Sequence, residues 1–286
     1  MPFHRNIPWA AAAIAIAALG VVGCRQVVRE PENGSGNEVQ PPRSPLPVAE
    51  APLNRADLLA AVAKAASATA LGADDSGAQR RLDGDRFELR IRVGCQGWVS
   101  PDDGADFEQR YASETRTLRL RATPDLTTAD SSVAELAGEA VEAVEGFWLP
   151  RPWMLTAGCP KVASVAQESV VPHDAEKSPG EGARTSSFAS PRVGIAQFFT
   201  AADARTGRRN QRAFEATKVL GDSEQPSAAG YDLVLSGRLA QLADGRVIAC
   251  RALRANIAPD CIVAANIDRV RLERGDTKAV LAEWDR

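Results

Sequence analysis

The chain has 286 residues, with 34 Lys or Arg against 37 Asp or Glu, and a formal net charge of −3 at pH 7. General nucleic-acid binding requires a strongly basic face, so this charge balance excludes that class and we expect no nucleic-acid partner. Aromatic residues make up only 5% of the chain, so any place where they gather is informative.

The first residues, MPFHRNIPWAAAAIAIAALGVVGC, have the pattern of an export signal. The apolar run 7–22 contains 16 residues, fewer than the roughly 20 that a spanning helix needs, and it follows a short positive head. The run ends in Val21-Val22-Gly23-Cys24, which resembles the lipobox of bacterial lipoproteins. The resemblance implies removal of a signal peptide 1–23 and acylation of the Cys24 thiol. An uncleaved anchor or an ordinary secretory signal is the alternative.

The composition of residues 24–53 favours a lipid-anchored flexible tether. The part after Cys24 contains six prolines, two glycines and few large apolar residues, so it cannot bury enough surface to offset the entropy of ordering. Arg25 follows the cysteine, which by analogy with enteric lipoproteins favours the outer membrane over the inner one. We therefore expect the protein in the cell envelope, facing the periplasm, with the membrane as a partner through its acyl anchor.

The remaining cysteines, Cys95, Cys159, Cys250 and Cys261, are even in number. In an oxidising compartment they are expected to form disulfides, with three connectivities open. We prefer Cys95–Cys159 and Cys250–Cys261, because each pair lies within one half of the chain. No C-x-x-C spacing occurs, and the only histidine after the leader is His173, so we expect neither a zinc site nor another cofactor.

A helix is predicted to begin after Asn54. Asn54 is a good N-cap residue, Asp57 completes a capping box, and Leu53 and Leu58 occupy the positions of a hydrophobic staple. Gly72 supplies the stop signal.

Alternation of apolar and polar residues predicts strands at 86–95 and 116–123. A short helix passing into a strand is expected over 132–145. The Pro-, Gly- and Ser-rich stretch 161–191 is predicted to be a long loop or linker.

The last third predicts an antiparallel meander. Strands are expected at 192–200 and 212–220, and Asp244-Gly245 predicts a two-residue hairpin turn that places Leu239 opposite Cys250. Further strands are expected at 261–273 and 278–284. The fold class is therefore mainly β (α+β), with antiparallel sheets and one N-terminal helix. Its β-rich parts, 54–160 and 192–286, are two subdomains or one composite domain.

Catalytic signatures are mostly missing from the sequence. It contains no G-x-S-x-G, H-E-x-x-H or Walker-type motif, and His173 is the only histidine base available to a triad. A carboxylate pair remains an alternative, because glycoside cleavage needs only two acids. The acidic loop is the place to look for it, or for a calcium site: Asp102, Asp103, Asp106 and Glu108.

Four arginines lie close together in a second loop: Arg205, Arg208, Arg209 and Arg212. Their guanidinium groups are candidates for pairing with phosphates or other envelope anions. A solvated loop end is the alternative.

The segment GFWLPRPWM, 146–154, gathers aromatic residues around two prolines. The prolines exclude a central strand and push the residue before each toward an extended conformation. Arg151 is then expected to lie over the ring of Trp148. We predict an aromatic cluster packed beside the Cys95–Cys159 disulfide. A ligand groove or partner surface built on Trp148, Arg151 and Trp153 is the alternative.

These observations favour a non-enzymatic, membrane-anchored envelope lipoprotein with a binding or structural role. Anionic envelope components or another envelope protein are the candidate partners. The alternative is an envelope hydrolase that uses a carboxylate pair or His173.

Overall fold

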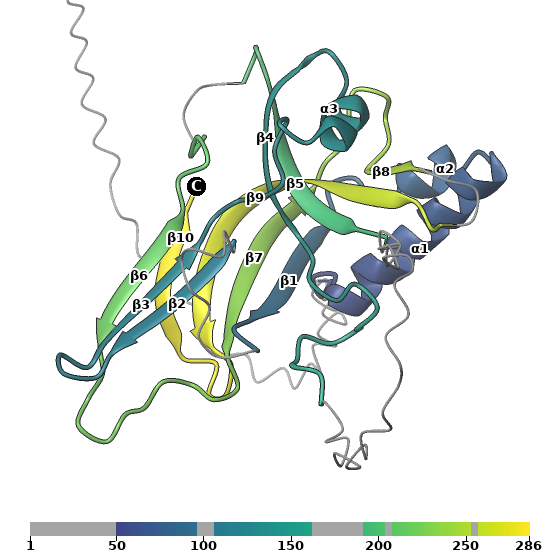
Figure 1. The fold of residues 1–286 in the computed structure, drawn as a ribbon. Helices are drawn as coiled ribbons and strands as arrows, with labels where there is room; N and C mark the ends of the chain where they lie inside the picture. The colour runs from purple at the N-terminus through teal and green to yellow at the C-terminus, as the bar shows by residue number, and fades with distance from the viewer. Residues whose placement is uncertain (1–49, 96–105, 162–190, 204–207, 253–256) are drawn as a thin grey trace, which may run out of the picture. The chain divides into compact units, whose positions relative to one another are not determined.

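The computed structural model describes residues 50–95, 106–161, 191–203, 208–252 and 257–286 (Figure 1). The described helices are α1 (Arg55–Leu71), α2 (Ser76–Gln79) and α3 (Ser131–Ala137). The described strands are β1 (Arg86–Val93), β2 (Phe107–Ala112), β3 (Thr117–Ala122), β4 (Val141–Trp148), β5 (Val193–Thr200), β6 (Phe214–Val219), β7 (Tyr231–Leu239), β8 (Ile248–Arg251), β9 (Asp260–Arg274) and β10 (Val280–Asp285). The expected mainly β class is confirmed.

Several sequence expectations fall outside the described residues. They concern the leader 1–23 with Cys24, the tether up to residue 49, most of the stretch 161–191 with His173, and three loop residues: Asp102, Asp103 and Arg205. No helix among the described residues has both the length and the apolar character that crossing a membrane requires.

Strand β9 is the centre of the larger sheet, because four other strands pair with it. Strands β8 and β7 lie one after the other along one edge of β9, and β5 and β10 lie along the opposite edge. The order across the sheet is β1-β7-β9-β5-β4. Among the named strands only the β5–β9 pair is parallel. Residues of 54–160 and of 192–286 therefore contribute strands to one sheet.

A smaller sheet has the order β2-β3-β6. Strands β3 and β6 match the predicted stretches 116–123 and 212–220, whereas β2 was not predicted. Its inward positions include Gln109, which is buried. A polar residue at that position interrupts the apolar alternation by which a strand is recognised.

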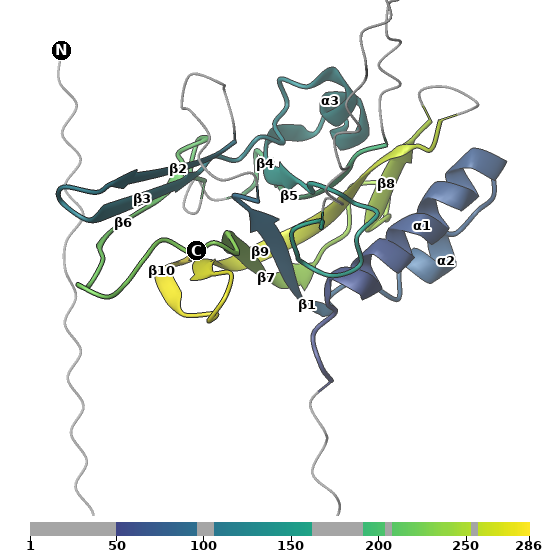
Figure 2. The ribbon, with the colours of Figure 1, turned by 60° about the horizontal axis from the view of Figure 1, so that its bottom comes forward.

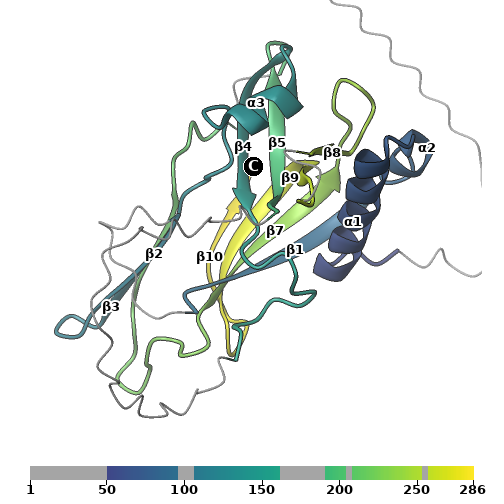
Figure 3. The same cartoon turned by 45° about the vertical axis from the view of Figure 1, so that its right-hand side comes forward.

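Different elements cover the two faces of the larger sheet. One core cluster joins apolar side chains of β1, β7 and β9 to those of α1 and of the smaller sheet, so both cover the same face. Figure 2 shows α1 and α2 at one end of this sheet and β2-β3-β6 at the other. Helix α3 covers the opposite face over β4 and β5, as Figure 3 shows.

A β-bulge changes which residues of β9 face the main core. Gly237 of β7 pairs with Ile267, but its neighbour Ser236 pairs with Arg269, so Asp268 is the extra residue. The inward positions are odd-numbered up to Ile267 and even-numbered from Val270 onward. A bulge of this kind also bends the strand. β9 can therefore pair with β8 and β5 near its start and with β7 and β10 toward its end.

Helix α1 begins and ends where the sequence predicts. The Asn54 side chain accepts from the N–H groups of Ala56 and Asp57, and Asp57 accepts in return from the Asn54 N–H at 3.0 Å. Gly72 ends the helix with a left-handed φ of 64°. The N-terminal helix and its capping box are confirmed.

The predicted hairpin around Asp244-Gly245 has its turn, but its two strands do not pair with each other as expected. The turn at Asp244-Gly245 exists, since the Leu242 N–H donates to the Arg246 carbonyl at 2.8 Å. However, β7 and β8 pair with β9 and not with each other, and Leu239 lies opposite Ala265, not Cys250. The reason is the length of β9, whose 15 residues offer one edge to both strands in succession.

Both predicted disulfides are confirmed. Cys250 and Cys261 are directly opposite each other on β8 and β9, with their Cα atoms 4.1 Å apart. Cys95 and Cys159 have Cα atoms 5.3 Å apart and join the end of β1 to the loop that follows β4.

Candidate functional site

A cavity of about 410 Å³ opens between the end of β1, the start of β2, the end of β3 and the end of β4. Its volume lies within the range of roughly 300–1,000 Å³ that is usual for small-molecule sites. The apolar wall consists of Ile91, Phe107, Ala122, Phe147, Leu149 and Leu233. The charged lining residues are Arg92, Asp106, Asp125 and Arg151.

The apolar wall follows from strand pairing. Ile91 of β1 lies opposite Leu233 of β7, and Phe107 of β2 lies opposite Ala122 of β3. Such cross-strand partners point to the same face of their sheet. The two pairs belong to different sheets, so the cavity lies where these sheets face each other, and the end of β4 in the larger sheet also lines it.

Two carboxyl groups line the cavity together. Asp125 accepts the main-chain N–H of Trp148 through Oδ1 at 2.9 Å. The pKa of Asp125 is raised to about 7. Burial is the main cause, the charge and hydrogen bond of Asp106 also raise the pKa, and the Trp148 N–H opposes them. Asp106 was a candidate from the sequence, whereas Asp125 was missed. Asp125 follows the end of β3 after Thr123 and Pro124, and no motif marks it.

Arg151 places a positive charge in the lining of the cavity. Its Nη2 donates to the Arg92 carbonyl at 2.7 Å and contacts Cys95 Sγ at 3.5 Å. No carboxylate among the described residues pairs with it, and Nε and Nη1 have no described acceptor. Burial, and then the charge of Arg92, lower the pKa of Arg151.

The expected extended conformation of Arg151 is wrong, because its φ is +53°. The cause is Arg55, which is buried at the start of α1 and donates from Nη2 to the carbonyls of Pro150 at 3.1 Å and Arg151 at 3.0 Å. In an extended chain consecutive carbonyls point in opposite directions, so they could not meet one guanidinium. A further bond joins Arg55 Nε to the Met154 carbonyl at 2.8 Å.

The predicted aromatic cluster does not form, and Arg151 does not lie over Trp148. Phe147 is buried in the main core, with its ring 6.2 Å from that of Phe214. The neighbouring side chain of Trp148 packs on the other face of β4, where Arg192 lies 4.3 Å from its ring centroid. Trp153 is 71% exposed. Strand alternation separates the first two rings, and the turn after β4 carries the third outward.

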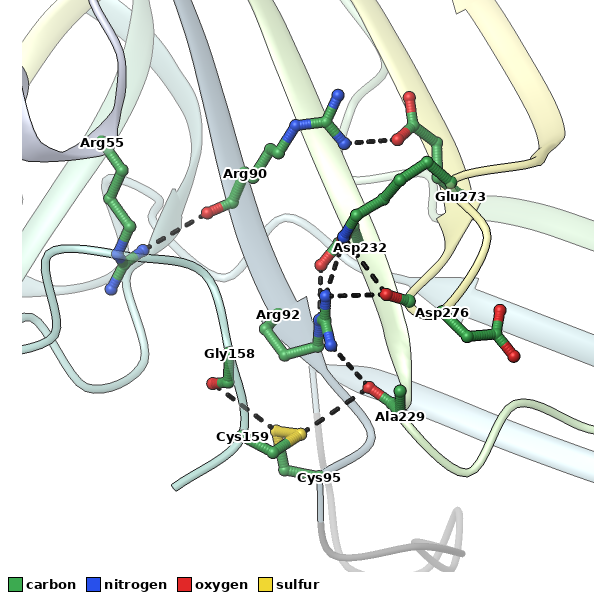
Figure 4. A network of polar contacts seen from close by, with 12 residues as sticks. Arg55, Arg90, Arg92, Cys95, Gly158, Cys159, Ala229, Asp232, Glu273 and Asp276 are labelled. Carbon is green, nitrogen blue, oxygen red and sulfur yellow. Dashed lines mark hydrogen bonds and ion pairs between the residues drawn. A yellow bond between two sulfur atoms is a disulfide. The ribbon is translucent and has the colours of Figure 1, made fainter. Parts of the chain in front are cut away.

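An ion network supports the β1 side of the cavity (Figure 4). Asp232 is fully buried and receives Arg92 Nε and Lys278 Nζ, each at 2.6 Å. Arg92 also donates to the carbonyls of Ala229 at 2.7 Å and Gly275 at 3.2 Å. Since these bonds occupy Arg92, its role is to hold the end of β1 in place.

The arginine loop is bound mainly to the protein itself. Arg208 pairs with Glu142 at 3.2 Å and lies 5.2 Å from the Phe199 ring centroid. Arg209 covers the ring of Phe214 at 4.2 Å and donates to main-chain carbonyls. Arg212 is exposed. Arg205 lies outside the described residues.

No protein-family model, curated protein or solved structure matches this chain. Within the described residues, no group of three or more His, Cys, Asp and Glu side chains could hold a metal ion. The site must therefore be understood from its own geometry.

The raised pKa of Asp125 predicts a loss of stability as pH rises. Between pH of about 4 and 7 the folded chain holds a proton on Asp125 that the unfolded chain has released, so the free energy of unfolding falls with pH in this window. We expect wild type to lose about 1–2 kcal/mol relative to Asp125→Asn between pH 5 and pH 8, after allowance for solvent screening.

Urea unfolding of both proteins at the two pH values measures this difference. The variant controls for the titrating groups that do not contact Asp125, because only this residue differs. Parallel stability curves for the two proteins would show that Asp125 has an ordinary pKa.

Proposed function

We propose that the protein is a non-enzymatic, lipid-anchored envelope protein that binds a small apolar ligand in the cavity between β1, β2, β3 and β4. The observation that carries this proposal is the lining: aliphatic and aromatic side chains form the walls, and a few charged groups stand among them. This is the composition expected of a small-molecule site, where apolar area provides affinity and polar groups fix orientation.

The chemistry of the lining favours binding over catalysis. Among the described lining residues there is no Ser, Thr, His, Lys or Tyr, and Cys95 is held in a disulfide. The usual nucleophiles of covalent catalysis, other than carboxylates, are therefore missing from this wall.

The place of action is proposed from the leader. The lipobox-like end at Cys24 supports acylation, and the Pro-rich composition of 25–53 supports a spacer between the bilayer and the folded body. Two disulfides fit an oxidising compartment.

Filling the cavity should abolish ligand uptake. Ala122 is buried at the wall, so Ala122→Leu places additional methyl groups in the cavity. We expect the affinity for the neutral dye N-phenylnaphthylamine, followed by fluorescence titration, to fall by about tenfold or more, the equivalent of about 1.4 kcal/mol.

The matched control is Ala112→Leu, which makes the same change at the exposed end of β2. It should bind the dye as wild type does. Wild-type protein that takes up no dye, or equal affinities for both variants, would contradict a ligand site in this cavity. Thermal unfolding of each variant confirms that it is folded.

The anchor has its own test in the mass of the protein extracted from membranes. We expect a mature chain that begins at Cys24 and carries acyl mass, and we expect Cys24→Ala to leave the membrane fraction. An unmodified mature chain, or a membrane-bound Cys24→Ala protein, would contradict the anchor.

A second candidate function is hydrolysis by the Asp106–Asp125 pair. One observation favours it: two carboxyl groups share the cavity, and one of them holds its proton near neutral pH, as a general acid requires. The binding function predicts no turnover of nitrophenyl glycosides, nitrophenyl esters or labelled casein. Turnover that Asp125→Asn lowers by about 100-fold or more would replace binding with hydrolysis.

A further inference from the structure

Three arginines gather beside the end of β1, and two of them, Arg92 and Arg151, line the cavity. Arg55, Arg92 and Arg151 lie around the same loop, where Arg151 reaches the Arg92 carbonyl and Arg55 reaches the Arg151 carbonyl. Only Arg92 has a carboxylate partner among the described residues, namely Asp232. Arg55 is fully used by carbonyls and is buried, so it cannot reach a ligand.

Arg151 differs from its two neighbours because part of its guanidinium has no partner among the described residues. Its Nη2 is fixed by the Arg92 carbonyl and contacts the Cys95 sulfur. The Nε and Nη1 groups have no acceptor among the described residues, and the side chain is half-buried in the cavity lining. The fork geometry of an arginine side chain matches the two oxygens of a carboxylate or a phosphate.

The carboxyl pair does not neutralise this charge. Asp125 is held against the Trp148 N–H and Asp106, on the side of β3 and β4. No ion pair joins either carboxyl to Arg151 in the described part of the chain. A half-buried cation without a counter-charge is unfavourable, and a bound anion would remove that penalty.

We propose that the ligand of this cavity is an amphiphile whose anionic head, a carboxylate or phosphate, binds Arg151 while its apolar body lies along Ile91, Phe147 and Leu233. This inference rests on the proposed function, since it names the ligand class of the same cavity. Arg151 then determines which head group the site prefers. The aliphatic and aromatic wall selects an apolar body for the rest of the ligand.

Three probes with the same chain and different heads test the proposal: decanoate, decanol and decylamine. Isothermal titration calorimetry at pH 7, below the micelle concentration of each probe, gives their affinities. We expect decanoate to bind about 10- to 100-fold more tightly than decanol, the range of a hydrogen-bonded charge interaction. Decyl phosphate distinguishes the two kinds of anionic head, and a gain over decanol for either of the two supports the proposal.

Arg151→Gln should remove the preference for decanoate and leave decanol binding unchanged, because the apolar wall remains. Decanol binding also shows that the cavity of this variant is intact. Arg151→Lys should retain part of the preference, since it keeps the charge without the fork. Arg212→Gln is the matched control at an exposed arginine outside the cavity and should behave as wild type does.

Each contrary outcome has a distinct meaning. Equal binding of decanoate and decanol would overturn the inference and leave the proposed function standing. Tightest binding of decylamine would overturn it in favour of the carboxyl pair as the head-group site. A preference for decanoate that survives in Arg151→Gln would also overturn it. If no probe binds and the neutral dye does not bind either, the proposed function fails together with the inference.

Discussion

The fold depends on one strand, β9, which pairs with four others along its 15 residues. Its first half is held between β8 and β5 and its second half between β7 and β10. The bulge at Asp268 lets both halves face the main core although the strand bends. Since β1 pairs with β7 and β4 pairs with β5, the two strands that bound the cavity reach their positions through β9.

The strand arrangement creates the cavity, and the charged side chains in its lining differ in how many partners they have. The smaller sheet covers the same face as α1. The end of β4 and the loop after it, which Arg55 holds against the start of α1, line the space between the two sheets. Arg55 and Asp232 are each saturated with partners and hold the wall. Within the described residues Asp125 and Arg151 are not paired with each other, so the guanidinium of Arg151 remains for the head group of a ligand in an apolar setting.

Local structure was predictable from the sequence, and long-range pairing was not. Local sequence pattern predicted the capping box at Asn54 and the strands β1 and β3, and these were confirmed. The number and positions of the cysteines predicted the preferred disulfides, which were also confirmed. The partner of β7 depends on the length of β9, which no turn signal reveals. Asp106 and Arg151 were identified as candidates, but Asp125 was not, because a single Asp after a strand carries no motif. The conformation of Arg151 was mispredicted because Arg55, 96 residues away, decides it.

A crystal structure of the protein with decanoate will show whether the cavity receives an apolar ligand with its anionic head at Arg151. We expect the carboxylate within hydrogen-bond distance of Arg151 Nε or Nη1 and the alkyl chain along Ile91 and Phe147. A cavity that contains only water, or a chain bound with its carboxylate away from Arg151, would contradict it.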